Sequence, residues 1–218
     1  MMQGTAQYIS SFFHKASFAQ PVKSACSAWV APIAGLMLLS GCMGVDNKPV
    51  TLPDFDTTAF SAMRLDARHL QIIENWAMPM QPPYIEHTLA PSPSEMVVDW
   101  ASGVLVPIAG SGEVVLDIQR ASVMVTDMPQ SKALLDVFRD QQAYKIRVDL
   151  EADLSWIQPV GGKQAFIELS ASAADTVEES ASPNSFDIAI REVMQQAITQ
   201  LDKEVRLKIA EIPEMTRP

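Results

Sequence analysis

Hydrophobic and polar residues alternate most regularly over residues 144–156, where an apolar residue stands at every second position. One face of this segment is apolar and the other is charged, which is typical of a strand in an antiparallel sheet with one wet face. Pro159, Gly161 and Gly162 follow as a turn, and residues 165–173 alternate again. The pattern therefore predicts a β-hairpin.

Two earlier segments also have the pattern of strands. Residues 113–126 alternate, but the apolar phase changes near Gln119 and Arg120. A β-bulge at this point would return both halves of the strand to the core, so we expect one there. Residues 69–76 form a further predicted strand, which a proline-rich loop follows.

Two segments have the period of amphipathic helices. Ser92, Pro93 and Glu95 form a capping-box signature, and an apolar stripe at helical spacing continues to Leu105 before Pro107 and Gly110 close it. Residues 186–205 repeat apolar positions over five turns, and Pro213 ends this helix. A short helix over residues 131–142 is also expected. The long helix carries two i,i+4 ion pairs that we expect on its wet side, Asp202 with Arg206 and Glu204 with Lys208.

The order of these elements predicts an α+β fold in a single domain over residues 63–213. We expect a small antiparallel sheet of about four strands with two helices packed on one face. Residues 42–62 contain prolines and aspartates that interrupt any apolar period, and they read as a tether that leads into this domain.

The N-terminal region has the pattern of an export signal. Residues 25–39 are apolar and uncharged, too short for a spanning helix but suited to a signal sequence, and Lys23 supplies the positive charge before them. A conventional leader would start at Val22, and we interpret the preceding residues as an over-annotated start. Residues 1–41 are thus predicted to be a signal peptide.

The segment Leu39-Ser40-Gly41-Cys42 resembles the lipobox of bacterial lipoproteins. The resemblance implies cleavage before Cys42 and acylation of Cys42, including palmitate, so that the protein is anchored to a bilayer by lipid. Met43 stands where aspartate commonly retains such proteins in the inner membrane. The resemblance therefore favours the cell outer membrane, with the domain facing the periplasm.

Charge and cysteine content exclude several classes of protein. The chain has 16 basic and 26 acidic residues and a net charge of −10. From Cys42 onward there are 14 basic and 26 acidic residues, a net charge of −12. This acidity argues against binding of nucleic acid, which needs clustered Lys and Arg. Two cysteines exclude a disulfide scaffold and a cysteine-built metal site.

The sequence contains no convincing catalytic or metal-binding pattern, and we expect neither an enzyme nor a cofactor. His69 and His87 lack the spacing of zinc ligands. Gly110-Ser111-Gly112 is better read as a turn than as a nucleophile elbow or phosphate loop. Three carboxylates share one strand face with Lys145 and Arg147, which favours a solvated face over an acid–base pair: Asp149, Glu151 and Asp153.

The proline-stiffened segment from Trp76 to Tyr84 is the best candidate for a docking site. Apolar and aromatic residues on such a loop suit contact with a protein partner. The candidates for that contact are Trp76, Met78, Met80 and Tyr84. The alternative is a loop that simply wraps the domain.

The chain resembles small envelope lipoproteins in its order of lipobox, tether, α+β domain and C-terminal helix. Among these are the auxiliary lipoproteins of ABC-type transport systems, whose Trp-Ala-x-Pro segment is similar to residues 76–79 here, and the lipopolysaccharide-assembly lipoprotein. The resemblance implies a non-catalytic accessory or docking subunit of an envelope transport or assembly complex, with an envelope protein as partner. The alternative is a periplasmic module that binds a lipid or another amphiphile between sheet and helices.

Overall fold

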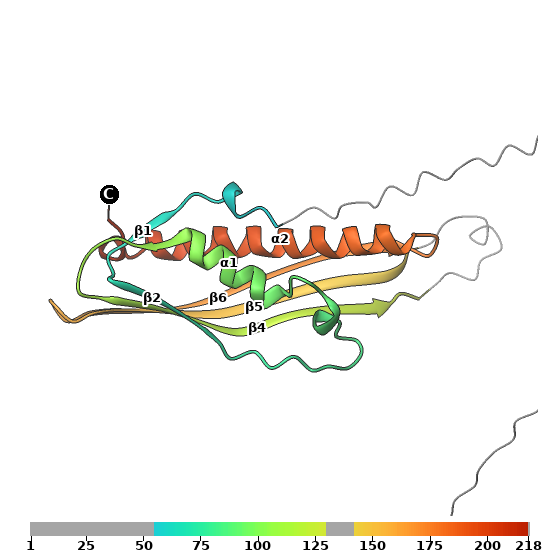
Figure 1. Cartoon of the computed structure of the whole chain (residues 1–218), viewed down its shortest axis with the longest axis horizontal. Helices are drawn as coiled ribbons and strands as arrows, with labels where there is room; N and C mark the ends of the chain where they lie inside the picture. The colour runs from blue at the N-terminus through green and yellow to red at the C-terminus, as the bar shows by residue number, and fades with distance from the viewer. Residues whose placement is uncertain (1–54, 130–141, 218) are drawn as a thin grey trace, which may run out of the picture. The chain divides into compact units, whose positions relative to one another are not determined.

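A computed structural model of the chain describes residues 55–129 and 142–217. It confirms the predicted α+β class, because two α-helices cover one face of a four-stranded sheet (Figure 1). The helices are α1 (Pro93–Val104) and α2 (Pro183–Ala210). The sheet has the order β2 (His69–Glu74), β4 (Glu113–Asp127), β5 (Gln142–Gln158) and β6 (Lys163–Glu178).

Shorter elements complete the described part of the chain. A separate two-stranded sheet pairs β1 (Met63–Leu65) with β3 (Leu105–Pro107) in parallel. Single 3-10 turns are η1 (Thr57–Ala59), η2 (Glu86–Thr88) and η3 (Pro213–Met215). The short helix that the sequence predicts over residues 131–142 falls almost wholly outside the described residues, although the first residue of β5 is Gln142.

The hairpin of β5 and β6 follows the alternation in the sequence. Val148 pairs with Ala173 and Leu154 with Ile167, so the buried apolar side chains of both strands lie on the face that the helices cover. Strand β4 pairs antiparallel with β5, and its register shifts between Ile118 and Arg120. The predicted bulge is thus confirmed, and apolar residues on both sides of it are buried.

One strand departs from the expected antiparallel arrangement. Strand β2 pairs with β4 in parallel, with His69 opposite Glu113 and Glu74 opposite Ile118. The physical reason is the connection, because α1 and β3 carry the chain back along the sheet before β4 begins, which is the path that a parallel pair requires. The sheet is therefore mixed. The strand predicted to reach Trp76 ends at Glu74, after which the Asn75 N–H still donates to the Ile118 carbonyl at 3.1 Å.

A loop segment and a buried carboxylate cover the outer edge of β4 beyond its bulge. The Ile85 N–H donates to the Val123 carbonyl at 3.0 Å, and the Val125 N–H donates to the Pro83 carbonyl at 2.9 Å. Glu86 Oε2 accepts from the Val123 N–H at 3.3 Å. The proline-rich loop therefore continues the edge that β2 leaves, although Pro83 itself has no N–H to contribute.

Both helices begin at serine caps followed by proline. Ser92 Oγ accepts from the Glu95 N–H at 3.3 Å, and Glu95 Oε2 accepts from the Ser92 N–H at 2.7 Å, so the predicted capping box is present. In α2, Ser182 Oγ accepts from the Ser185 N–H at 3.1 Å. This second cap starts the long helix three residues before the predicted position.

The core lies between the sheet and the helices and is closed by two tryptophans. Trp100 and Trp156 are fully buried, and the Trp156 Nε1–H donates to the Asp66 carbonyl at 2.9 Å. The Asp202–Arg206 pair exists at 2.7 Å, but Asp202 is buried and does not lie on the wet side of α2. Its burial follows from α1, because the Trp100 Nε1–H donates to Asp202 Oδ1 at 3.1 Å.

The C-terminal residues close the end of the domain next to β1. The Asp66 N–H donates to the Met215 carbonyl at 2.9 Å, and the Arg217 N–H donates to the Arg64 carbonyl at 2.9 Å. Met215 is completely buried. Ahead of β1, Phe55 and Phe60 lie in the segment that the sequence assigns to the tether, and both pack against the core. Among the described helices, none has the length and apolar character that a membrane crossing requires.

Candidate functional site

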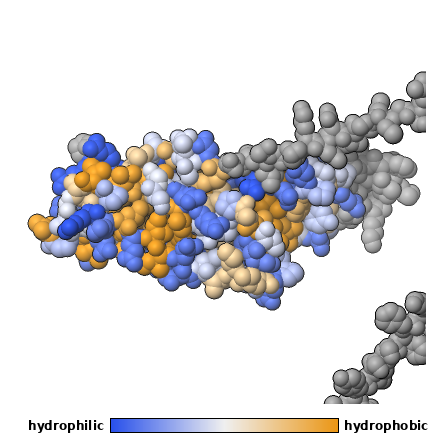
Figure 2. Space-filling view, in the orientation of Figure 1, coloured by the Kyte–Doolittle hydropathy of each residue, from blue (hydrophilic) through white to orange (hydrophobic). Residues whose placement is uncertain are grey.

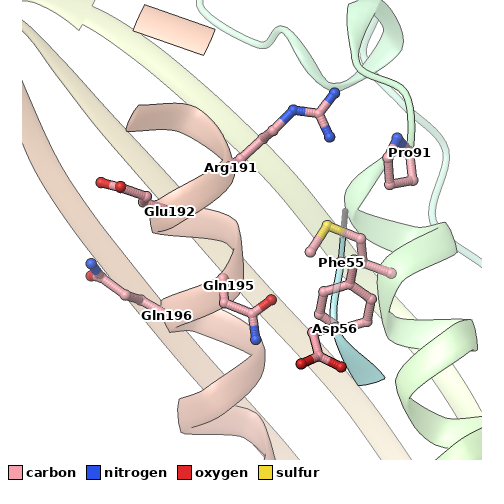
Figure 3. A pocket seen from close by; sticks show the side chains of 8 residues that line it. Phe55, Asp56, Pro91, Arg191, Glu192, Gln195 and Gln196 are labelled. Carbon is pink, nitrogen blue, oxygen red and sulfur yellow. The ribbon is translucent and has the colours of Figure 1, made fainter. Parts of the chain in front are cut away.

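An apolar hollow lies on the outer side of the two helices, where the chain enters the domain (Figure 3). We call it the interhelical groove, and its volume is about 410 Å³. It is lined by Phe55, Asp56, Pro91, Met96, Arg191, Glu192, Gln195 and Gln196. The groove therefore brings together the N-terminal segment, the loop before α1, the first turn of α1 and the middle of α2.

The groove has an apolar interior and a polar rim. Phe55, Pro91 and the buried Met96 supply the interior, and Phe55 lies between the two helices (Figure 3). Gln195 points toward Phe55 and Asp56, while Glu192 and Gln196 point away from them. An apolar hollow of this volume with a few polar groups at its rim suits a ligand that has an apolar body and a polar end.

The charged groups at the rim have fixed positions. Asp56 caps η1, where it accepts from the Thr58 N–H at 2.9 Å and the Thr58 hydroxyl at 2.6 Å. These hydrogen bonds, first that of the Thr58 side chain, lower the pKa of Asp56 below its usual value. Arg191 Nη2 donates to the Ala90 carbonyl at 2.9 Å and so joins α2 to the loop. Asp56 is therefore an anion at neutral pH, and Arg191 lines the same groove.

A smaller hollow continues the groove on the other side of Arg191. It has a volume of about 110 Å³ and shares Pro91 and Arg191 with the groove. Leu89, Ile190 and Met194 contribute its apolar part. The two hollows together form a shallow track along α2.

The predicted docking loop contains one strongly exposed apolar residue. Met80 is 65% exposed and has a φ of 54°, a backbone conformation that residues other than glycine seldom adopt. Trp76, Met78 and Tyr84 are half-buried. Tyr84 is held by a backbone bridge to Met124, and the Trp76 Nε1–H is buried without a partner. The structure therefore leaves Met80 as the side chain of this loop that is most available to a partner, and docking there stays a prediction.

The Gly110-Ser111-Gly112 segment forms part of a polar hollow at the other end of the domain. Ser111 Oγ donates to Gln158 Oε1 at 2.7 Å, so the hydroxyl has a side-chain amide as its hydrogen-bond partner. Gly110 has a φ of 99°, and a Cβ there would lie 2.4 Å from Asp66 Oδ1. The glycine is needed for this close approach. The arrangement agrees with the reading of this segment as a turn.

The three carboxylates of β5 that face away from the helices have separate surroundings, and Asp149 is buried although the sequence predicted a solvated face. Arg147 binds Asp149 at 2.9 Å, and Arg120 binds Glu151 at 2.9 Å. Asp153 instead pairs in register with Asp117 on β4 and with Glu168 on β6. Burial, and then repulsion from Glu168 and Asp117, raises the pKa of Asp153.

The remaining sequence-based candidates do not meet at one place. His69 lies at the start of β2 and His87 in η2, and both are exposed. The part of the chain that the structure describes contains no cluster of three or more potential metal ligands. Cys42, the predicted lipidation site, precedes the described residues.

Sequence reasoning did not identify the interhelical groove. Its lining comes from three separate segments, and Phe55 and Asp56 fall in the predicted tether. One signal was available, since Phe55 and Phe60 are bulky apolar residues in an otherwise polar stretch, and such residues often pack against a domain. Their rings lie 6.5 Å apart.

Comparison with known proteins gives remote likenesses only. No family model and no curated sequence matches the chain. Rare lipoprotein B from Shewanella oneidensis is similar with a TM-score of 0.36 and 9% identity, over 66% of this chain and 96% of that chain. A minor lipoprotein from Acinetobacter baumannii gives a TM-score of 0.35 and 11% identity, over 71% of this chain and 99% of that chain. Likenesses at these scores are too weak to transfer a function to this chain.

Proposed function

We propose that this chain is a lipid-anchored bacterial envelope lipoprotein that acts as a non-catalytic accessory or docking subunit of an envelope transport or assembly complex. The observation that carries the proposal is the lipobox Leu39-Ser40-Gly41-Cys42 after a charged and apolar leader. The separate surroundings of the histidines and carboxylates in the described domain agree with a binding role.

The anchor is tested by metabolic labelling. Bacteria that express the full chain are fed an alkyne-bearing palmitate analogue, and the purified chain is examined for label and for its N-terminal mass. We expect label on the unsubstituted chain and on Cys26→Ala, and none on Cys42→Ala. Cys26→Ala is the matched control, because Cys26 belongs to the predicted leader. Label that persists in Cys42→Ala would overturn the anchor.

The choice of membrane is tested by density-gradient separation of inner and outer membranes. We expect the chain in the outer-membrane fraction and expect Met43→Asp to move it toward the inner membrane. Equal distribution of both forms would contradict the assignment.

The docking role is tested by capture of partners from detergent-solubilised envelopes. Met80→Asp places a charge at the most exposed side chain of the predicted docking loop, so we expect it to release a reproducible envelope partner. Val160→Asp is the control, since Val160 is 75% exposed at the tip of the β5–β6 hairpin and far along the chain from the loop. If no reproducible partner is captured, or if both variants release it equally, the proposed role of this loop is wrong.

The interhelical groove favours a second candidate, the binding of an amphiphile. This hollow lies on the outer side of the helices, whereas the space between helices and sheet is filled by Trp100, Trp156 and their neighbours. The position therefore differs from the one that the sequence suggested. The apolar interior and the charged rim fit a single alkyl chain with a polar head.

The test of this second candidate uses an alkyl phosphocholine that carries a diazirine, which cannot serve as an acyl donor to a cysteine. After photolysis in membranes that contain the full chain, we expect cross-linked peptides from residues 55–56 and from α2. Gln195→Trp fills the rim and should lower cross-linking several-fold, whereas Gln200→Trp, one turn beyond the groove and exposed, should not. Equal cross-linking of the two variants would exclude the groove.

A further inference from the structure

Strand β6 forms the outer edge of the four-stranded sheet, and among the residues that the structure describes none is a backbone partner of its middle on that side. The sheet ends at β6 in the order β2-β4-β5-β6. Two side chains mark which backbone groups point outward: the Glu168 carbonyl accepts from Lys208 Nζ, and the Thr176 N–H donates to Asp175 Oδ1 at 2.7 Å. Outward groups recur at every second residue of a strand. Ser170, Ser172 and Ala174 therefore direct their N–H and C=O groups away from the sheet.

The register of the whole sheet leads to the same assignment. Val123 and Val125 of β4 bond outward to the loop at residues 83–85, so the intervening Met124 bonds inward to β5. Met124 pairs with Arg147, so the odd residues of this part of β5 bond to β4 and its even residues bond to β6. The even residues of β5, such as Val148, pair with odd residues of β6, such as Ala173. The odd residues of β6 therefore bond inward, and its even residues direct their backbone groups outward. The six N–H and C=O groups of Ser170, Ser172 and Ala174 thus form an open edge.

This open edge lacks the features that normally keep edge strands apart. Sheet edges in native proteins are usually protected by a lysine, a proline, a bulge or a short strand. Residues 169–174 read Leu-Ser-Ala-Ser-Ala-Ala, with no charge and no proline, and β6 pairs with β5 without a register shift there. By contrast, β2 at the opposite edge is only six residues long.

We propose that this edge pairs with the same edge of a second copy of the chain, antiparallel and centred on Ser172. In this register Ser172 faces Ser172 of the second copy, and Ser170 faces its Ala174. Glu168 then faces Thr176 of the second copy, so no like charges stand opposite each other. The pairing satisfies all six open groups on each copy.

Charge complementarity at the ends of the open edge supports a second copy of the chain as the partner, and it supports this register. Lys208 lies over the Glu168 carbonyl at one end, and Asp175 lies over the Thr176 N–H at the other. A two-fold axis at Ser172 brings Lys208 of each copy next to Asp175 of the other. Within one copy Lys208 also binds Glu204 at 3.0 Å, so each contact with Asp175 of the other copy would extend an existing ion pair across the interface. Both α2 helices would lie on the same face of the joined sheet, because antiparallel pairing of edges preserves the face.

Cysteine cross-linking of the full chain in detergent tests the register. Ser172→Cys should form a disulfide-linked dimer on mild oxidation, since the Cα atoms of opposed residues in an antiparallel pair lie about 5.5 Å apart, within disulfide range. Ser170→Cys alone should not, but a mixture of Ser170→Cys with Ala174→Cys should. The unsubstituted chain, oxidised in parallel, sets the baseline from Cys26 and Cys42.

A charge variant tests the interface without a new cysteine. Ser172→Lys places two lysines opposite each other and should raise the dimer dissociation constant by about tenfold or more in sedimentation experiments. Ser172→Thr should not, and Ser172 is exposed, so the circular dichroism of both variants should match that of the unsubstituted chain. A monomeric unsubstituted chain, equal cross-linking of Ser170→Cys and Ser172→Cys, or cross-links only to another protein would each overturn the proposal. None of these results depends on the lipid anchor or the amphiphile.

Discussion

At the scale of single residues, the open face of the sheet contains a row of acidic side chains that the fold forces together. Asp117, Asp153 and Glu168 stand side by side on β4, β5 and β6. Asn75 Nδ2 donates to both carboxylate oxygens of Asp117, at 2.7 and 2.8 Å, and so relieves one end of the row. Asp153 in the middle has acidic neighbours on both sides, and like charges directly opposite each other destabilise a sheet.

Neutralising the middle of this row should stabilise the domain at neutral pH. Burial, Glu168 and Asp117 raise the pKa of Asp153 in the folded state, so the folded chain binds this proton more tightly than the unfolded chain does. Stability from this group is present at low pH and is lost as pH rises through the folded pKa. We expect Asp153→Asn to add about 0.5 kcal/mol to the free energy of unfolding at pH 7.

Urea unfolding of the unsubstituted chain and of Asp153→Asn measures this gain in stability. We expect the gain to shrink toward zero as the pH approaches 4. Glu151→Gln on the same strand is the control, because Glu151 binds Arg120 and its neutralisation removes an attractive partner. A gain of equal size at pH 4 and pH 7 would contradict the electrostatic cause.

Among the charged residues described, we expect the substitution of Asp202 to lower the free energy of unfolding most. It accepts from Trp100 Nε1 and binds Arg206 through Nε at 2.7 Å and Nη2 at 3.0 Å, while it is itself buried. Asp202→Ala removes the acceptor of a buried indole N–H and the carboxylate partner of Arg206, so we expect the free energy of unfolding to fall by about 3 kcal/mol. Lys203→Ala, exposed on the same turn, should change stability by less than about 0.5 kcal/mol. Equilibrium denaturation measures both.

At the scale of elements, the local signals of the sequence were sufficient wherever an element is defined by its own residues. The capping box that starts α1, the bulge in β4 and the hairpin of β5 and β6 all appear where the pattern places them. Each depends on side chains a few residues apart or on a change of phase within one strand.

Pairing between distant segments could not be predicted in the same way. The parallel β2–β4 pair depends on the path of α1, and β1 and β3 are three residues each, too short to show a period. The groove needs residues from the first and last parts of the domain sequence, and the buried Asp202 accepts a hydrogen bond from Trp100 of α1, which is 102 residues away in the sequence. Tertiary contacts decided all of these features.

The serine cap of α1 provides a test at this scale. Ser92→Ala removes the acceptor for the Glu95 N–H, so we expect the free energy of unfolding to fall by about 1 kcal/mol. Ser102→Ala lies within the same helix and is exposed, and it should be neutral or slightly stabilising because alanine has the higher helix propensity. A loss of similar size in both variants would mean that the cap contributes little.

At the scale of the whole molecule, apolar and polar residues are intermixed on the face that Figure 2 shows. Apolar patches are separated by hydrophilic residues on the side shown in Figure 2. The first strand of the domain and its last described residues are hydrogen-bonded to each other, because β1 lies between β3 on one side and residues 215–217 on the other. The last residues are therefore part of the domain, although the sequence predicted its end at residue 213.

Met215 tests this closure. It is completely buried beside β1, so Met215→Ala should lower the free energy of unfolding by about 3 kcal/mol through lost packing and a residual cavity. Glu214→Ala removes only an exposed pair with Lys163 at 3.4 Å and should cost less than about 1 kcal/mol. Thermal and urea unfolding of both variants measure the difference, and equal losses would show that the C-terminal turn does not close the domain.

The position of β1 has a mechanical consequence. Tension that enters through the residues before Phe55 reaches a strand that is hydrogen-bonded to β3 on one side and to residues 215–217 on the other. Arg206 of α2 also donates to the Ser61 carbonyl, just ahead of this strand. A pull from the N-terminal side is therefore resisted by the hydrogen bonds that β1 makes on both of its sides, including those to the C-terminal residues.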